Sequence, residues 1–243
     1  MTLRIQKFIA NAGITSRRKA EQMILNGQVS LNGKTVTQLG ITIDPSKDIV
    51  KVDGKVIDPS PKQSIVYAFY KPKNCVTTLD DPQGRDTIVK YFPRTAGRLF
   101  PIGRLDYDAE GLLLLTNDGA IANNIIHPSK HVWKTYFVKL KGKIKIEEFA
   151  KLRPGPIIDG KKRQPVKIKF LHFINEKSWL MVSLQEGLKN QLKKMFFSIG
   201  YPVEKIKRYS VGNIELNDMR PGDIRLLSKA DVQSLLELSK NLT

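Results

Sequence analysis

The sequence has little of the chemistry on which many proteins depend. Its 243 residues include one cysteine, Cys75, and three scattered histidines. A lone cysteine excludes a disulfide within the chain and a cysteine-based zinc site. No stretch approaches the ~18 consecutive apolar residues that span a membrane, and the N-terminus lacks the apolar core of ~7–15 residues that marks a secretion signal. We therefore expect a cytoplasmic protein with no membrane partner.

Positive charge is what the chain has in excess. It carries 41 lysines and arginines against 23 aspartates and glutamates, a net charge of +18. The excess is present throughout: residues 1–60 hold nine basic and five acidic side chains, and residues 161–208 hold twelve and three. Repulsion among so many positive side chains opposes folding unless a bound polyanion relieves it. We therefore expect a nucleic-acid partner.

The first ~57 residues have the pattern of a small α+β module. Apolar spacing predicts a helix that ends before Gly13, and Thr15 or Ser16 can cap a second helix that runs to residue 25. Asn32-Gly33 predicts a hairpin over residues 29–36, because both residue types tolerate positive φ. Residues 58–64 contain two prolines and no periodicity, which indicates a linker and a domain boundary after residue 60.

The remainder, residues 61–243, is rich in strand signals. Strands are expected at residues 65–70, 112–115, 135–140 and 179–184. Helices are expected at residues 120–126, at residues 189–199 and after Ser228, which opens a capping-box pattern. This alternation predicts a sheet-rich domain, and the whole chain is expected to be α+β.

Residues 102–111 are the most unusual stretch, because three carboxylates and Arg104 precede an apolar run. The carboxylates are Asp106, Asp108 and Glu110. Spacing alone leaves three interpretations open. They are a solvated surface loop, a nucleophile or base at the mouth of a pocket, and a Mg²⁺ site with oxygen ligands.

A second basic stretch, residues 184–195, contains Lys189, Lys193 and Lys194. It fits either a helix start that contacts phosphates or the exposed lysine face of an amphipathic helix.

Short motifs in a fixed order connect these stretches. In the first module they lie at residues 4–10, 13–21 and 27–33. Further on they lie at residues 70–73, 77–78, 81–85, 101–106 (with Gly-Arg-Leu-Asp), 111–119, 127–128, 134–136, 200–208 and 220–225. Each fragment is weak, but their number and order are specific. Over nearly its whole length the chain resembles the bacterial ribosomal-RNA pseudouridine synthases of the RsuA/RluB type.

The resemblance implies an S4-like RNA-binding domain over residues 1–60. It implies a catalytic domain over residues 61–243 with a long mixed, mostly antiparallel sheet. The implied activity is a cofactor-free isomerase, with no metal, that converts a specific uridine of ribosomal RNA to pseudouridine. Large-subunit RNA is favoured over small-subunit RNA. The implied partner is ribosomal RNA or a ribosomal subunit precursor, and the default oligomeric state is a monomer.

The family pattern also implies roles for individual residues. Asp106 would be the catalytic aspartate, Tyr136 would lie against the flipped target base, and Lys193 would be the basic partner of Asp106. Whether the reaction passes through a covalent adduct or a glycal stays open. The residues expected to contact RNA are Arg17, Arg18 and Lys19 in the first module and Lys71, Arg85, Arg104, Lys134, Lys189 and Lys194 in the second.

Three positions depart from the family pattern. Ala109 stands where many members have threonine, and Leu188 and Asn190 stand where arginines are usual. Two other classes of function stay open. A non-catalytic RNA-binding or ribosome-assembly factor fits the charge equally well, although it has no need of Asp106. A DNA-binding regulator fits poorly, because no helix pair outside residues 4–25 offers a recognition helix.

Overall fold

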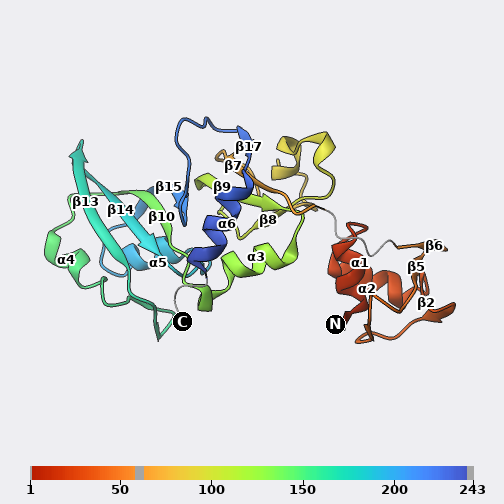
Figure 1. The fold of residues 1–243 in the computed structure, drawn as a ribbon. Helices are drawn as coiled ribbons and strands as arrows, with labels where there is room; N and C mark the ends of the chain where they lie inside the picture. Colours follow the sequence, from red (N-terminus) through yellow and green to blue (C-terminus); the bar gives the residue numbers. More distant parts are fainter. Residues whose placement is uncertain (1, 58–62, 240–243) are drawn as a thin grey trace. The chain divides into compact units, whose positions relative to one another are not determined.

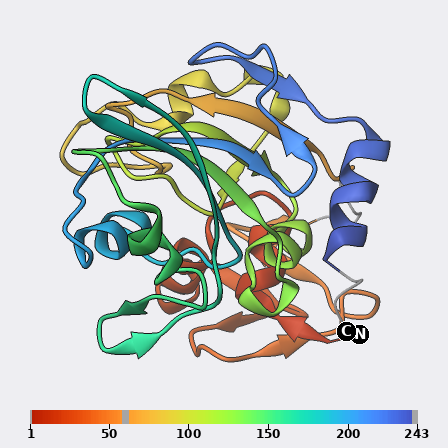
Figure 2. The ribbon, with the colours of Figure 1, turned by 90° about the vertical axis from the view of Figure 1, so that its left-hand side faces the viewer.

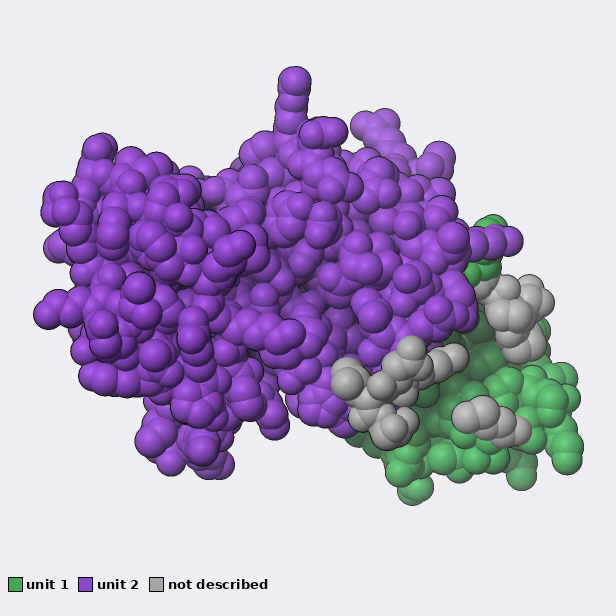
Figure 3. Space-filling view, turned by 60° about the vertical axis from the view of Figure 1, so that its left-hand side comes forward, with its two compact units in different colours: residues 1–64, 117–119 green, residues 65–116, 120–243 purple. Residues whose placement is uncertain are grey.

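The computed structural model describes residues 2–57 and 63–239, and the chain divides into two compact units (Figures 1 and 3). Unit 1 comprises residues 1–64 and 117–119, and unit 2 comprises residues 65–116 and 120–243. Most of the predicted linker, residues 58–62, and with it the boundary after residue 60, lies outside the described residues.

Unit 1 packs two helices on small antiparallel sheets. Its elements are β1 (Leu3–Arg4), α1 (Ile5–Asn11), α2 (Arg17–Leu25), β2 (Val29–Leu31), β3 (Lys34–Val36), β4 (Thr42–Ile43), β5 (Val50–Val52) and β6 (Lys55–Val56). Strands β3, β2, β5 and β6 form one sheet in that order, and β1 pairs with β4. The N-cap of α2 is Ser16, whose side chain accepts from the Lys19 amide at 3.1 Å. Asn32 and Gly33 both have positive φ, so the predicted hairpin is confirmed.

Unit 2 is built on a nine-stranded sheet. Seven strands follow the order β13 (Lys167–Ile174), β14 (Lys177–Leu184), β10 (Lys134–Leu140), β15 (Val203–Val211), β9 (Glu110–Thr116), β7 (Val66–Lys71) and β17 (Ile224–Leu226). Two short strands, β8 (Phe100–Ile102) and β16 (Ile214–Glu215), pair with β9 and β15. Only β15 and β9 pair in parallel among the described strands. The expected mixed, mostly antiparallel sheet and the α+β class are confirmed.

Helices and short turns cover both faces of this sheet (Figures 1 and 2). The helices are α3 (Gly119–Ile126), α4 (Ile146–Ala150), α5 (Gln191–Phe197) and α6 (Lys229–Leu238), with 3₁₀ turns at η1 (Ile88–Tyr91), η2 (Arg94–Ala96) and η3 (Pro128–Lys130). A small hairpin of β11 (Ile157–Ile158) and β12 (Lys161–Lys162) stands apart from the main sheet. The capping box predicted at Ser228 is confirmed at the start of α6.

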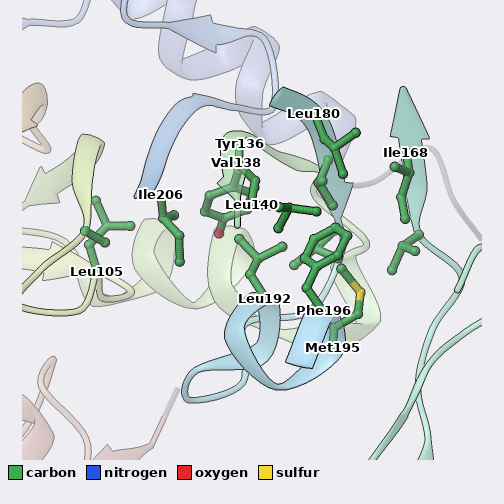
Figure 4. Close-up of a cluster of buried hydrophobic side chains, with 14 of the residues drawn as sticks. Leu105, Tyr136, Val138, Leu140, Ile168, Leu180, Leu192, Met195, Phe196 and Ile206 are labelled. Atoms are coloured by element: carbon green, nitrogen blue, oxygen red, sulfur yellow. The ribbon is translucent and has the colours of Figure 1, made fainter. Parts of the chain in front are cut away.

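Strand β9 divides the hydrophobic core, because alternate residues face opposite sides of a sheet. Leu112 and Leu114 join the cluster that contains residues of α3 and α6, whereas Leu113 and Leu115 join the cluster that contains Ile88 of η1. The second cluster extends along the sheet to α5. There Leu192, Met195 and Phe196 pack against side chains of β10 and β14 (Figure 4).

The backbones of β9 and β15, the parallel pair, approach each other closely near the start of β9. Gly111 of β9 lies opposite Arg208 of β15 and has φ +114. A Cβ at this position would lie 2.2 Å from the Arg208 carbonyl oxygen, so only glycine fits. The approach places the loop that precedes β9, residues 103–109, beside β15 and β10.

Candidate active site

A cavity of about 380 Å³ opens where that loop meets β10, β15 and the start of α5. This volume lies within the ~300–1,000 Å³ of ordinary small-ligand pockets. The polar side chains that line it are Arg104, Asp106, Lys134, Glu186, Lys189, Asn190, Gln191 and Arg208, together with the ring of Tyr136. The structure therefore gathers residues that lie more than 100 positions apart in the sequence.

Buried polar side chains fix the backbone of the loop that carries Asp106. The hydroxyl of Thr77 donates to the Leu105 carbonyl at 2.7 Å, and the Lys71 ammonium donates to the Ala109 carbonyl at 2.8 Å. The Arg208 Nε donates to the Leu112 carbonyl at 2.6 Å. Because these bonds are shielded from water, they hold the loop in one conformation before any ligand binds.

Tyr136 forms an aromatic wall of the cavity. It lies on the central strand β10, opposite Val182 of β14 and Arg208 of β15, and is only 8% exposed. In Figure 4 its ring lies beside Ile206 and Leu192. Asp106 is half-buried at the same cavity. The arrangement thus joins a carboxylate to an apolar slot that has one aromatic face.

The basic partner expected for Asp106 is engaged elsewhere. The Lys193 ammonium lies 2.8 Å from Oδ1 and 2.6 Å from Oδ2 of Asp108, two positions beyond Asp106. Burial alone would raise the pKa of Asp108, but the hydrogen bond and charge of Lys193 outweigh it and hold the pKa below its usual value. The structure thus shows a Lys193–Asp108 pair, and the role of Lys193 as the partner of Asp106 stays a prediction.

Arg208 is a site residue that we did not single out from the sequence. Its side chain is 4% exposed on β15 and lines the cavity. Besides the bond to Leu112, its Nη1 lies 3.5 Å from the Arg104 carbonyl, and its Nη2 has no hydrogen-bond partner among the described residues. In the sequence Arg208 is one cation in a basic run, and no local pattern separates it from its exposed neighbours.

Comparison with known proteins bears directly on this site. Residues 65–198 match the family described as RNA pseudouridylate synthase, and residues 3–49 match the S4 domain. The chain is 39% identical to ribosomal large subunit pseudouridine synthase B of Bacillus subtilis, over 97% of this chain and 96% of that protein. The chain belongs to the RNA pseudouridylate synthase family.

Two further matches cover this synthase almost completely. An uncharacterized RNA pseudouridine synthase of Aquifex aeolicus is 37% identical over 98% of this chain and 95% of that protein. A crystal structure of a pseudouridylate synthase has a TM-score of 0.68 and 30% identity, with 96% of this chain and 99% of that one covered. The expected resemblance and the isomerase class are therefore confirmed.

Lys71 of the synthase is too deeply buried to contact RNA. The side chain is fully buried and donates to the carbonyls of Pro72 and Ala109. Burial lowers the pKa of Lys71 to about 8 against the opposing charges of Cys75, Asp108 and Asp106. An ammonium group with no exposed surface cannot meet a phosphate, so the predicted RNA contact at Lys71 is wrong and its role is structural.

The other predicted RNA contacts of unit 2 fall into two groups. Arg104, Lys134 and Lys189 line the cavity. Lys194 instead pairs with Asp159 at 2.5 Å, and Arg85 forms a two-bond ion pair with Asp81. The Arg85 hydrogen bonds lower the pKa of Asp81 to about 2, so this ion pair persists through the whole physiological range.

In the S4 domain, Arg17, Arg18 and Lys19 occupy the first turn of α2, and all three are exposed. Their contact with RNA stays a prediction. No group of three or more metal-binding side chains occurs in the part of the chain that the structure describes. Within the same residues, no helix is long and apolar enough to cross a membrane.

Proposed function

We propose that this synthase isomerises one uridine of large-subunit ribosomal RNA in the cavity that holds Asp106. The observation that carries the proposal is the combination of one carboxylate, one aromatic face and several cations in a single preformed pocket. The choice of large-subunit over small-subunit RNA rests on the name of the Bacillus subtilis relative, which is matched over 97% of this chain.

The reaction rearranges bonds within one nucleotide and needs no other reactant. The bond from sugar carbon-1′ to uracil N1 breaks, the uracil turns, and carbon-1′ joins carbon-5. Carbon-5 loses its hydrogen, and N1 of the product carries one, so the atoms balance. Asp106 either attacks carbon-1′ to form an adduct or removes a sugar proton to form a glycal. Both routes require its ionised carboxylate.

The cavity suits a uracil that has left the RNA stack. An enzyme that acts on a base within a folded nucleic acid must first extrude that base. Tyr136 provides a flat face for stacking, with Leu105, Leu192 and Ile206 as apolar neighbours. In this proposal the hydroxyl of Tyr136 relays a proton: its oxygen takes the proton that carbon-5 releases as its own proton passes to water. Arg104, which is exposed at the cavity, fills the space left in the RNA and holds a neighbouring phosphate.

Arg208 and Lys134 are two of the cations at the cavity. Both line the cavity, whereas Lys193 is bound to Asp108. Burial, followed by the charge of Arg208, lowers the pKa of Lys134 to about 8, so most Lys134 side chains are still charged at pH 7. In this proposal Lys134 offers positive charge to the phosphate of the bound nucleotide, whereas Arg208, which is 4% exposed, holds the backbone on either side of Asp106.

We further propose that the protein works as a monomer in the cytoplasm, on ribosomal RNA or on a subunit precursor. The exposed basic turn of α2 gives the S4 domain a second, phosphate-directed contact.

The test is to incubate the purified chain with unmodified large-subunit and small-subunit RNA and then map pseudouridine by carbodiimide treatment and primer extension. We expect one new stop, in large-subunit RNA only. A stop in small-subunit RNA would overturn the target. Tight RNA binding with no stop in either RNA or in subunit precursors would favour the assembly-factor function.

A further inference from the structure

The side chain of Phe197 is unusually exposed. At 72% it is the most exposed large hydrophobic side chain among the described residues. A single exposed apolar residue is ordinary on a protein surface and needs no explanation by itself. The position of Phe197 on α5 and the charged side chains nearby indicate a role in binding.

Phe197 ends the helix whose first residues line the cavity. Gln191 and Leu192 of α5 face the cavity, and at ~1.5 Å of rise per residue Phe197 lies about 9 Å further along the helix axis. Side chains three and four positions apart share a helix face, so Phe197 lies on the same side as Lys193 and Lys194. Phe197 thus lies on the lysine-bearing face of α5, one to two turns beyond the residues that line the cavity.

The hairpin of β11 and β12 extends this basic surface. It packs beside α5 and is joined to it by the ion pair between Lys194 and Asp159. Its strand β12 presents Lys161 and Lys162, both exposed. Ile157, which pairs with Lys162 across the hairpin, is 69% exposed and adds a second apolar side chain. Lys193 and Lys194 of α5 are each balanced by a carboxylate, Asp108 and Asp159, so the net positive charge of this surface comes from the exposed lysines of the hairpin.

We propose that Phe197 is a stacking subsite for an unpaired base of the RNA that flanks the target uridine, with Lys161 and Lys162 on its phosphates. Exposed aromatic rings surrounded by lysines are the usual platform for single-stranded nucleic acid, because every base has a face that can stack. The occupant is RNA rather than protein, because the surrounding charge is positive. This subsite rests on the proposed function, but its binding assay needs no turnover.

Phe173 provides a matched control. It is also exposed, at 46%, but its ring packs on Phe170 at 4.7 Å between centroids and lies under Lys143 at 5.9 Å. It lies on β13, which is the outermost strand of the sheet and contributes no residue to the cavity. Among the described residues, Phe197 has no comparable ring partner.

The experiment compares Phe197→Ala, Phe197→Trp and Phe173→Ala for binding to unmodified large-subunit RNA transcript at several salt concentrations. Loss of one base–aromatic stack typically weakens binding by about 5- to 150-fold. We expect a loss of this order for Phe197→Ala, no loss for Phe197→Trp, and no change for Phe173→Ala. The salt slope of Phe197→Ala should equal that of the wild type, because no charge is removed.

Two further readouts separate stacking from a structural effect. The melting temperature of Phe197→Ala should match the wild type, because the ring is largely in solvent. Changing Lys161 and Lys162 together to Met should instead flatten the salt slope. Equal affinity of Phe197→Ala and Phe173→Ala for RNA would overturn the proposal. Normal binding of Phe197→Ala to naked RNA with weakened binding to a subunit precursor would also overturn it, by assigning the ring to a protein partner.

The binding comparison does not depend on turnover. Absence of isomerisation would therefore overturn the proposed function without overturning the stacking subsite, and equal binding of the variants would do the reverse. Where turnover is measurable, Phe197→Ala should raise KM and leave kcat within about twofold, because the ring acts on substrate binding away from the reacting atoms.

Discussion

Replacing Gly111 with alanine should damage the junction on which the active-site loop depends. The added Cβ would lie 2.2 Å from the carbonyl oxygen and 2.5 Å from the amide nitrogen of Arg208, and neither backbone atom can move without disturbing β15. The φ of +114 adds conformational strain, since L-residues rarely adopt it.

The magnitude follows from these two costs. Overpacking costs about 1–3 kcal/mol. A non-glycine residue in a strained backbone region costs a further ~1–3 kcal/mol. Gly111→Ala should therefore lower the free energy of unfolding by about 2–6 kcal/mol, a large part of the ~5–15 kcal/mol of an ordinary domain.

Urea unfolding measures this loss, with Gly142→Ala as the control. Gly142 has φ +90, nothing lies within 4 Å of its would-be Cβ, and it contributes nothing to the cavity, so its variant carries the strain alone. We expect Gly111→Ala to be less stable than Gly142→Ala by at least about 1 kcal/mol. Its activity should also fall, because Arg208 would no longer hold Leu112. Equal losses in the two variants would refute the close approach of β9 and β15.

Two further predictions concern charge at the cavity and beside it. Asp108→Asn should free Lys193 for a phosphate, so that RNA binds more tightly and the salt slope steepens by about 0.7–0.9; an unchanged slope in salt-dependent binding would contradict this role of the pair. Lys134, with its pKa of about 8, loses its charge as the pH rises, so RNA affinity should fall between pH 7 and pH 9. Lys134→Met should show a shallower fall in the same titration, and an identical fall would exclude Lys134 as a phosphate contact.

Local signals in the sequence were enough to predict the elements whose turns or helix caps are formed by neighbouring residues. The hairpin at Asn32-Gly33, the cap at Ser16 and the capping box at Ser228 all depend on residues within a few positions of one another. Strand β15, in contrast, was not predicted. Lysines, arginine and glutamate make up much of its nine residues, and it owes its central place in the sheet to pairing with β10 and β9.

At the site, too, local motifs predicted some features, whereas others depend on contacts between distant residues. The motif at residues 101–106 identified Asp106 and Arg104, and both line the cavity. Which carboxylate holds Lys193 depends on how α5 meets the loop, a contact between residues 85 positions apart. Burial separates Lys71 and Arg208 from the exposed cations of the chain, and a lysine or arginine in a sequence carries no sign of burial when its partners are backbone carbonyls.

The most direct test of the account is tritium release from ribosomal RNA labelled at uracil carbon-5, with the wild type and Asp106→Asn assayed in parallel. The substitution keeps the size of the side chain and removes its negative charge. We expect release by the wild type, none by Asp106→Asn, and equal RNA binding by both. Appreciable release by Asp106→Asn would show that Asp106 is not the nucleophile and would contradict the assignment of this cavity.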